Sequence, residues 1–206
     1  MFRRRREMKT DYNLRLALLK SRMPRLVIRR YMNGVHCQII QYAKEGDRTI
    51  MEVSSNSLRQ FGWKSHPANL PAAYLTGMLT GFLALKKGTK EAVVDLGLQR
   101  STKGNALYAC IAGAADAGMK IPVNKEILPS KERLTGKHVS QFALSLKKTP
   151  EKYKRQFAQY AKAGLEPEKL EEHFIATQNK IRESFKDAIK LAAFEETAGS
   201  FLEKES

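Results

Sequence analysis

Asp95 is the residue with the clearest potential for catalysis, because it is a lone carboxylate within an apolar run, Val94-Asp95-Leu96. Such a group could act as a general base or help to bind a metal ion. The four histidines are scattered, and none lies at metal-ligand spacing from a cysteine. A buried aspartate more often accepts hydrogen bonds from its own protein. We therefore interpret Asp95 as structural and keep a nucleic-acid-processing enzyme, such as a nuclease, as the alternative.

The segment Ser101-Thr102-Lys103-Gly104-Asn105 is a second candidate site, between an expected strand and an expected helix. Free backbone N–H groups at a helix N-terminus, with a lysine and hydroxyl groups, can bind an anion such as an RNA phosphate. The spacing is not that of a P-loop. An ordinary helix cap explains the same residues, and both interpretations stay open.

Cationic and aromatic side chains alternate in two further segments, Trp63-Lys64 and residues 152–157. Unpaired RNA bases stack on aromatic rings beside cations. The alternative is that Tyr153, Phe157 and Tyr160, which share one helix face, dock that helix on the rest of the protein. We favour docking for Phe157 and RNA contact for the cations.

The charge of the chain is strongly positive and unevenly distributed. The 37 lysines and arginines exceed the 21 acidic residues, which gives a net charge of +16 and a pI near 9.9. Residues 1–30 contain eleven basic and two acidic side chains, or +9. Cations that neutralise phosphates release condensed counterions, so this composition indicates a polyanionic partner. An anionic membrane surface and a merely soluble basic protein are the weaker alternatives.

A basic arm of residues 1–23 is expected to precede the body. Arg3–Arg6 repel one another, so this part should be extended without a partner. A short helix should follow, with Thr10 as its N-cap. Its apolar face is expected to comprise Tyr12, Leu16 and Leu19, with Arg15 and Arg22 pointing away.

The body, residues 24–122, is expected to be an α/β layer. Alternating and β-branched residues predict strands at 25–30, 35–42 and 49–54, with turns at Asn33-Gly34 and Gly46-Asp47. A helix from Pro71 to about Gly88, a strand at 92–98 and a helix at 105–117 follow. Strand, helix and strand in this order predict parallel pairing through a crossover helix. The predicted fold is therefore a mixed sheet of about four strands, an antiparallel meander plus one parallel strand, with packed helices.

Small and apolar residues of the body support the same interpretation. Gly77 and Gly81 indicate close packing of their helix on a sheet. The dense apolar stretch at 70–85 is sixteen residues long, which is short for a bilayer span of about twenty. Cys37 and Cys110 lie in apolar surroundings and are interpreted as core residues. We expect a cytoplasmic protein.

An extended loop region, 123–150, is expected to lead to C-terminal helices within residues 151–206. One helical segment should cover 151–163 and end at Gly164, and a longer helix should begin at Pro167. The apolar stripe of that longer helix is expected to comprise Leu170, Phe174, Ile181, Phe185 and Ile189.

A dense series of short motifs runs in order from residue 2 to about 138. The motifs are Phe2-Arg3-Arg4-Arg5-Arg6-Glu7, Lys9-Thr10-Asp11-Tyr12, Pro24-Arg25-Leu26-Val27, Gly46-Asp47-Arg48-Thr49, Gly62-Trp63-Lys64, Pro71-Ala72-Ala73-Tyr74-Leu75-Thr76-Gly77, Asp95-Leu96-Gly97-Leu98, Thr102-Lys103-Gly104, Asp116-Ala117-Gly118 and Ile121-Pro122. In these the chain closely resembles the 5S-rRNA-binding large-subunit ribosomal protein family, called protein eighteen in bacteria and archaea and protein five in eukaryotes. The archaeal branch is the most similar. Two departures are Met8, where the arm usually has a glycine, and Gln99-Arg100-Ser101, which replaces the usual His and Pro context.

The resemblance implies a mixed α/β domain, not an enzyme, whose arm lies along 5S rRNA in the central protuberance of the large ribosomal subunit. Large-subunit rRNA and the other 5S-binding ribosomal protein would be its neighbours. It implies no cofactor, no small-molecule substrate and no membrane. The side chains that we expect to contact RNA are Arg3, Arg4, Arg5, Arg6, Lys9, Tyr12, Arg15, Arg22, Arg25, Trp63, Lys64, Thr102, Lys103, Lys147, Lys148, Lys152, Lys154 and Arg155.

Overall fold

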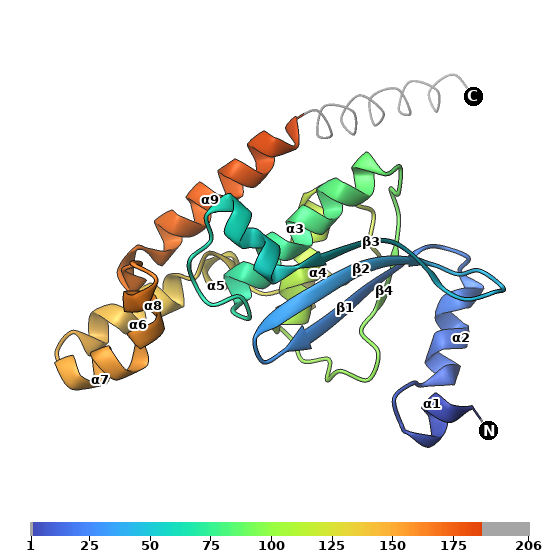
Figure 1. Ribbon diagram of the computed structural model, residues 1–206, viewed down its shortest axis with the longest axis horizontal. Coiled ribbons are helices and arrows are strands. Elements are labelled where there is room, and N and C mark those ends of the chain that lie inside the picture. Colours follow the sequence, from blue (N-terminus) through green and yellow to red (C-terminus); the bar gives the residue numbers. More distant parts are fainter. Residues whose placement is uncertain (1, 187–206) are drawn as a thin grey trace.

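The computed structural model describes residues 2–186, and its centre is a four-stranded sheet (Figure 1). The strands are β1 (Arg25–Tyr31), β2 (Gly34–Gln41), β3 (Arg48–Ser54) and β4 (Val93–Asp95). Their order is β3-β2-β1-β4, with antiparallel pairing except between β1 and β4, which are parallel. The predicted mixed sheet is confirmed.

The two faces of the sheet differ in chemistry because side chains alternate along each strand. Leu26 and Ile28 of β1 and Cys37 of β2 are fully buried on the face that helices cover. The opposite face carries Arg25 and Arg29, the neighbours in sequence of those core residues. This outer face is where the N-terminal arm lies.

The β1–β2 hairpin turns one residue earlier than expected. Tyr31 pairs directly with Gly34, so the two loop residues are Met32 and Asn33. Gly34 instead begins β2, where a Cβ atom would lie 2.9 Å from Oγ of Ser55. That hydroxyl accepts a hydrogen bond from the Val35 N–H at 3.0 Å, which explains the need for a glycine.

Two long helices, α3 (Leu70–Lys86) and α4 (Ala106–Asp116), pack on the inner face and against each other. The expectation that Gly77 and Gly81 pack on the sheet is wrong, because both lie against α4. A Cβ atom on Gly77 would overlap the Cys110 carbonyl, and one on Gly113 of α4 would overlap the Tyr74 carbonyl. Small residues on both helices therefore allow their backbones to touch.

The arginine run is not extended, as we had expected, but forms one helical turn, α1 (Arg3–Arg6). The Phe2 carbonyl accepts from the N–H groups of Arg5 and Arg6. Glu7 lies 3.7 Å from Arg3 and 2.9 Å from Lys9, so it offsets part of the repulsion between the cations. Met8 then adopts a φ of 49°, a left-handed conformation that favours the glycine usual at this position in the resembling family.

The second helix of the arm, α2 (Tyr12–Lys20), begins one residue later than expected. Its N-cap is Asp11, whose carboxylate accepts from the N–H groups of Asn13 and Leu14. Thr10 instead accepts a hydrogen bond from Nε of Arg4 at 2.8 Å. The predicted apolar face is also wrong: Leu16 is exposed, and Arg15 points to the body because a carboxylate binds it there.

Residues 123–150 are not an extended loop, because most of them form short helices. Ser130 precedes one of these and Gly136, with a φ of 87°, separates two of them. The segment expected at 151–163 is also divided, at Phe157. The elements are η1 (Ser55–Phe61), η2 (Lys125–Ile127), α5 (Lys131–Thr135), α6 (Lys137–Leu146), α7 (Pro150–Gln156), α8 (Ala158–Lys162) and η3 (Pro167–Lys169), where η marks 3-10 helices.

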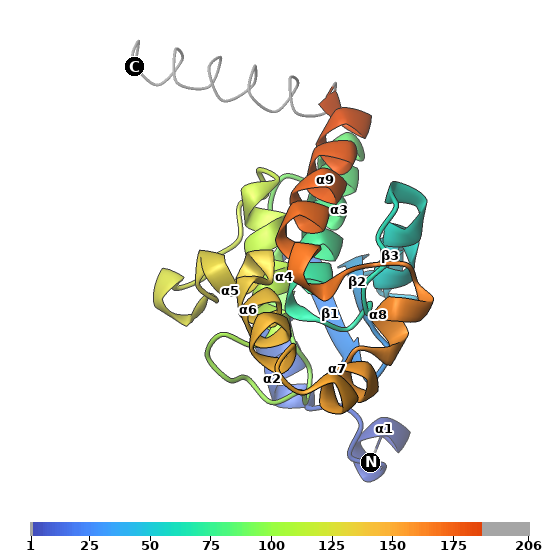
Figure 2. The ribbon, with the colours of Figure 1, turned by 90° about the vertical axis from the view of Figure 1, so that its left-hand side faces the viewer.

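The long C-terminal helix, α9 (Leu170–Ser184), runs alongside α3 (Figure 2). Phe174 contacts Tyr74, with ring centroids 5.7 Å apart, and Phe185 stacks on Phe82 at 5.8 Å. The predicted stripe of α9 is therefore packed on the body as far as Phe185. Its last expected member, Ile189, lies outside the described residues.

The remaining expectations for the body concern its cysteines and its longest apolar helix. Cys37 and Cys110 are free and buried, as predicted for core residues. Burial raises the pKa of the Cys110 thiol, which is further raised by the neighbouring Cys37. None of the helices within residues 2–186 has the length and apolar character that a membrane span requires.

Candidate nucleic-acid interface

The arm presents its cations to solvent. All four arginines of α1, and Lys9 after it, are exposed, and α1 has no buried residue. Tyr12 is half-buried and stacks on Phe2, with ring centroids 5.0 Å apart. Arg22, after α2, is exposed with a φ of 57°. The sequence-predicted arm residues thus lie together on one projection from the body.

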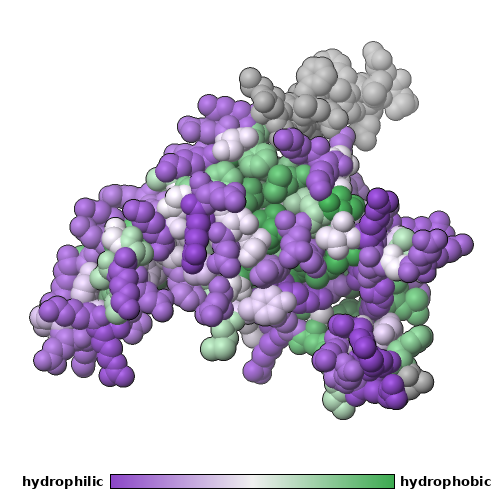
Figure 3. Space-filling view, in the orientation of Figure 1, coloured by the Kyte–Doolittle hydropathy of each residue, from purple (hydrophilic) through white to green (hydrophobic). Residues whose placement is uncertain are grey.

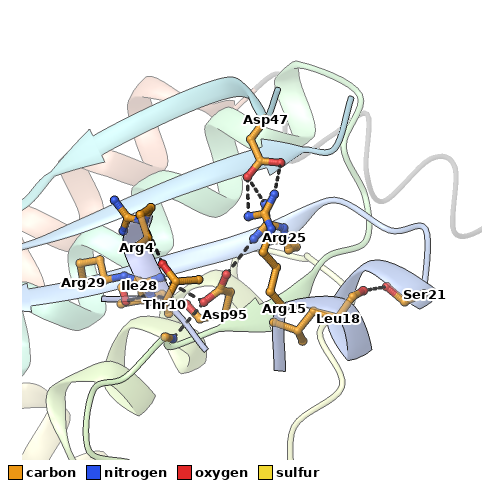
Figure 4. A network of polar contacts seen from close by, with 11 residues as sticks. Arg4, Thr10, Arg15, Leu18, Ser21, Arg25, Ile28, Arg29, Asp47 and Asp95 are labelled. Carbon is orange, nitrogen blue, oxygen red and sulfur yellow. Dashed lines mark hydrogen bonds and ion pairs between the residues drawn. The ribbon is translucent and has the colours of Figure 1, made fainter. Parts of the chain in front are cut away.

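A ladder of alternating charges ties the arm to the sheet (Figure 4). Arg15 of α2 donates to both oxygens of Asp47, at 2.8 and 2.9 Å. Arg25 donates to Asp47 at 2.6 Å and to Asp95 at 2.9 Å. Arg29 donates to the second oxygen of Asp95 at 3.0 Å. Hydrogen bonds from Arg15, and then from Arg25, hold the pKa of Asp47 below its usual value.

The ladder corrects one predicted RNA contact and settles the role of the carboxylate. Arg25 is only 3 % exposed and both of its terminal nitrogens are bound, so its predicted contact with RNA is wrong. Asp95 is 8 % exposed and also accepts from the Gly97 N–H, which confirms the structural interpretation. Among residues 2–186, no group of three His, Cys, Asp or Glu side chains could hold a metal ion. Asp95, the carboxylate that the nuclease alternative named, is held by Arg25, Arg29 and the Gly97 N–H.

Trp63 is also not available to RNA. It is 3 % exposed and stacks on His173 of α9, with ring centroids 5.0 Å apart and an angle of 22° between the rings. The Lys64 N–H donates to Nε2 of the same histidine at 3.0 Å, while the Lys64 side chain is exposed. The prediction of base stacking on Trp63 is wrong, because a partner more than 100 positions later in the sequence covers the ring.

The loop before α4 has the contacts of an ordinary helix cap. The Asn105 side chain accepts from the N–H groups of Leu107 and Tyr108, and the Gly104 N–H donates to the Ile127 carbonyl. These donors are therefore occupied within the protein. Thr102 and Lys103 remain exposed and could still make single contacts with RNA.

The comparison with known families follows the same N-terminal region. The family model described as ribosomal large subunit proteins 60S L5, and 50S L18 matches residues 1–91. Over these residues the chain is similar to that family. The match covers the arm, β1 to β3 and α3, and thus includes both Arg15 and Asp47.

The second group of predicted contacts lies beyond the part that matches the ribosomal family. Figure 1 shows the helices that carry it, α6 to α8, at the opposite end of the molecule from the arm, and Figure 3 shows hydrophilic side chains at both ends. Lys147 lies 3.1 Å from Glu168, which also accepts from the Tyr153 hydroxyl. Phe157 is buried between Phe142 and Tyr160, as the docking interpretation predicted. The exposed cations of this group are Lys147, Lys148, Lys152, Lys154 and Arg155.

Sequence reasoning did not identify Asp47 or Arg29 as parts of the interface. The sequence places Asp47 in a turn and in one of the family motifs, and nothing local indicates that α2 lies over that turn. A usable signal did exist for Arg29. Because residues two apart in a strand share a face, Arg25 and Arg29 had to lie on the same side of the sheet.

Proposed function

We propose that the protein binds 5S rRNA and helps to attach it to large-subunit rRNA in the central protuberance of the ribosome. It would work in the cytoplasm as a structural component. Its neighbours would be rRNA and other ribosomal proteins, including the other 5S-binding protein. The family match supports a role in the large subunit, and the finer assignment is our inference.

One observation carries this proposal, namely the exposed arginine turn on an arm that the body holds by an ion pair. The guanidinium groups of Arg3–Arg6 have the fork geometry that suits phosphate oxygens. The Arg15–Asp47 contact places α2 against the sheet without using the α1 cations. Part of the conformational entropy that the arm would lose on binding RNA has therefore already been lost when the protein folds.

We further propose a division of the interface. The arm, residues 1–23, would form the contact with 5S rRNA. The exposed cations of α6 to α8 would make a second contact, because the two groups lie at opposite ends of the molecule (Figure 1). Lys64, Thr102 and Lys103 would add single contacts from exposed loops.

The proposal is tested by the affinity of the purified protein for 5S rRNA and for tRNA at matched salt. We expect tighter binding to 5S rRNA and a steep fall in affinity with salt, because several phosphates are neutralised together. Equal affinity for the two RNAs at every salt concentration would overturn specific recognition.

The role of the arm needs a control that removes the same charge elsewhere. Replacing Arg3–Arg6 with glutamine should weaken 5S rRNA binding and flatten the salt dependence by about two units or more, since each lost phosphate contact contributes roughly 0.9 to the slope. The control replaces four exposed lysines of the body and loops with glutamine: Lys44, Lys86, Lys125 and Lys131. If both quadruple variants lost the same affinity and slope, general charge and not the arm would carry binding.

A further inference from the structure

A cleft of about 540 Å³ lies between the N-terminal arm and the outer face of the sheet. Its floor is formed by Val27, Gln38 and Ile40, which are side chains of β1 and β2 on the face that α3 and α4 leave open. Residues of α2 form one wall, and the loop after β4 forms another. The volume is in the range of pockets that hold small organic ligands.

The walls of the cleft are apolar to an extent that a site for phosphate alone would not require. Leu14 and Leu18 of α2 and Leu98 of the loop after β4 all line it. Leu14 and Leu98 are exposed, at 42 % and 58 % of their surface. A flat apolar group placed between these walls would remove them from water.

Three carboxylates line the cleft, and the third of them, Asp11, caps α2 through one oxygen. The carboxylates of Asp47 and Asp95 are bound by the arginine ladder. Arg4, at the arm side of the cleft, uses only Nε, which donates to Thr10, and its two terminal nitrogens have no partner among the described residues (Figure 4). The cleft therefore favours a ligand that combines an apolar ring with an anion.

The guanidinium plane of Arg29 provides a fixed surface beside the cleft. Its Nη1 donates to the carbonyls of Ile28 and Asp95 at 2.8 and 2.7 Å, and its Nη2 donates to the Asp95 carboxylate. Gly97 approaches it with a φ of 60°, and a Cβ atom there would lie 2.8 Å from Nη2. A guanidinium group held in this way can stack on a nucleobase.

We propose that this cleft takes one unpaired nucleotide of the bound RNA. The base would lie between the leucine walls and the floor. Its phosphate would meet the terminal nitrogens of Arg4, beside Lys9, which is 2.9 Å from Glu7. The inference rests on the proposed function and adds a pocket for a base to the phosphate contacts of the arm. It also explains why apolar side chains are exposed within the most basic part of the protein.

The test fills the cleft without changing charge. Leu98→Trp places a larger ring at a wall residue that is 58 % exposed, so the fold should tolerate it. Ile175→Trp is the matched control, on α9 at a residue that is 47 % exposed and does not line the cleft. Both variants are compared with the full wild-type chain by thermal unfolding, by 5S rRNA affinity at several salt concentrations, and by chemical probing of 5S rRNA bases at saturating protein.

We expect Leu98→Trp to lower affinity roughly 10-fold, the scale of one lost base stack, with the salt slope and unfolding temperature unchanged. One unpaired base, or one short unpaired segment, should be protected by the wild type and by Ile175→Trp but regain reactivity with Leu98→Trp. Unchanged protection and affinity in Leu98→Trp would overturn the cleft site, and so would an even loss of all protections. A wild-type protein that leaves no specific footprint on 5S rRNA would overturn the proposed function itself.

Discussion

Arg15 and Asp47, which lie 32 positions apart, form a two-pronged ion pair that joins the N-terminal arm to the β2–β3 turn at 2.8 and 2.9 Å. Asp47 also accepts from the buried Arg25, so one carboxylate serves an arm residue and a strand residue. Because both arginines hold the pKa of Asp47 below its usual value, the carboxylate stays charged throughout the neutral range. The direction of the arm is thus set by a contact that neutral pH does not weaken.

Asp47→Asn is expected to weaken 5S rRNA binding roughly 3- to 10-fold, although it removes a negative charge from an RNA-binding protein. From charge alone, the loss of a negative side chain should strengthen RNA binding. The stability should fall by about 1–3 kcal/mol, because the buried Arg25 loses a charged partner. The control is Glu45→Gln in the same turn, an exposed acid that makes no ion pair within the described residues. Tighter binding by Asp47→Asn, equal to that of Glu45→Gln, would refute a positioning role.

Gly113→Ala should destabilise the protein by about 1–3 kcal/mol or more, measured by chemical denaturation. Helix propensity alone predicts a gain of up to about 1 kcal/mol from this change within α4. The loss is expected because the new methyl group would overlap the Tyr74 carbonyl of α3. Ala115→Ser, on the half-exposed side of the same helix, should stay within about 0.5 kcal/mol. A stabilised Gly113→Ala would show that the two helices are free to separate.

Phe82→Ala is expected to cost about 3–5 kcal/mol of unfolding free energy, because the ring is buried and stacks on Phe185. The comparison is Phe142→Ala, which removes an exposed ring of the same type from α6 and should cost less than half as much. A loss below about 1 kcal/mol for Phe82→Ala would contradict the packing of α9 along α3. Denaturant midpoints and slopes of both variants provide the measurement.

The His173–Trp63 stack should respond to acid. Burial, and then Lys64 and Lys180, lower the pKa of His173 from 6.5. The folded state favours the neutral ring, because Nε2 of His173 accepts a hydrogen bond from the Lys64 N–H. The stability that this contact contributes is therefore complete above pH 6.5, and it is lost as the pH falls through the lowered pKa of the folded state. Trp63 is the single tryptophan, so its fluorescence should titrate with a midpoint below 6.5. His173→Gln should abolish that titration and His138→Gln should not; a midpoint above 6.5 would contradict the contact.

Much of the body follows from local patterns in the sequence. Alternating residues at 25–30 and 35–42 give strands because one face of each must be buried, and Pro71 starts α3 because it suits the first helical turn. The concentration of cations in the arm is likewise a property of composition alone. These features depend on neighbours within a few residues, so the amino-acid order was sufficient to predict them.

The availability of each predicted contact was decided by the tertiary structure. Arg25 and Trp63 have the residue types that bind RNA, yet Asp47 and Asp95 enclose the first and His173 covers the second. In the same way, α4 rather than the sheet receives the glycines of α3. The physical reason is common to these cases. Whether a cation or ring faces solvent depends on groups brought from distant positions in the chain, and their arrangement is fixed only when the arm, the sheet and α9 pack together.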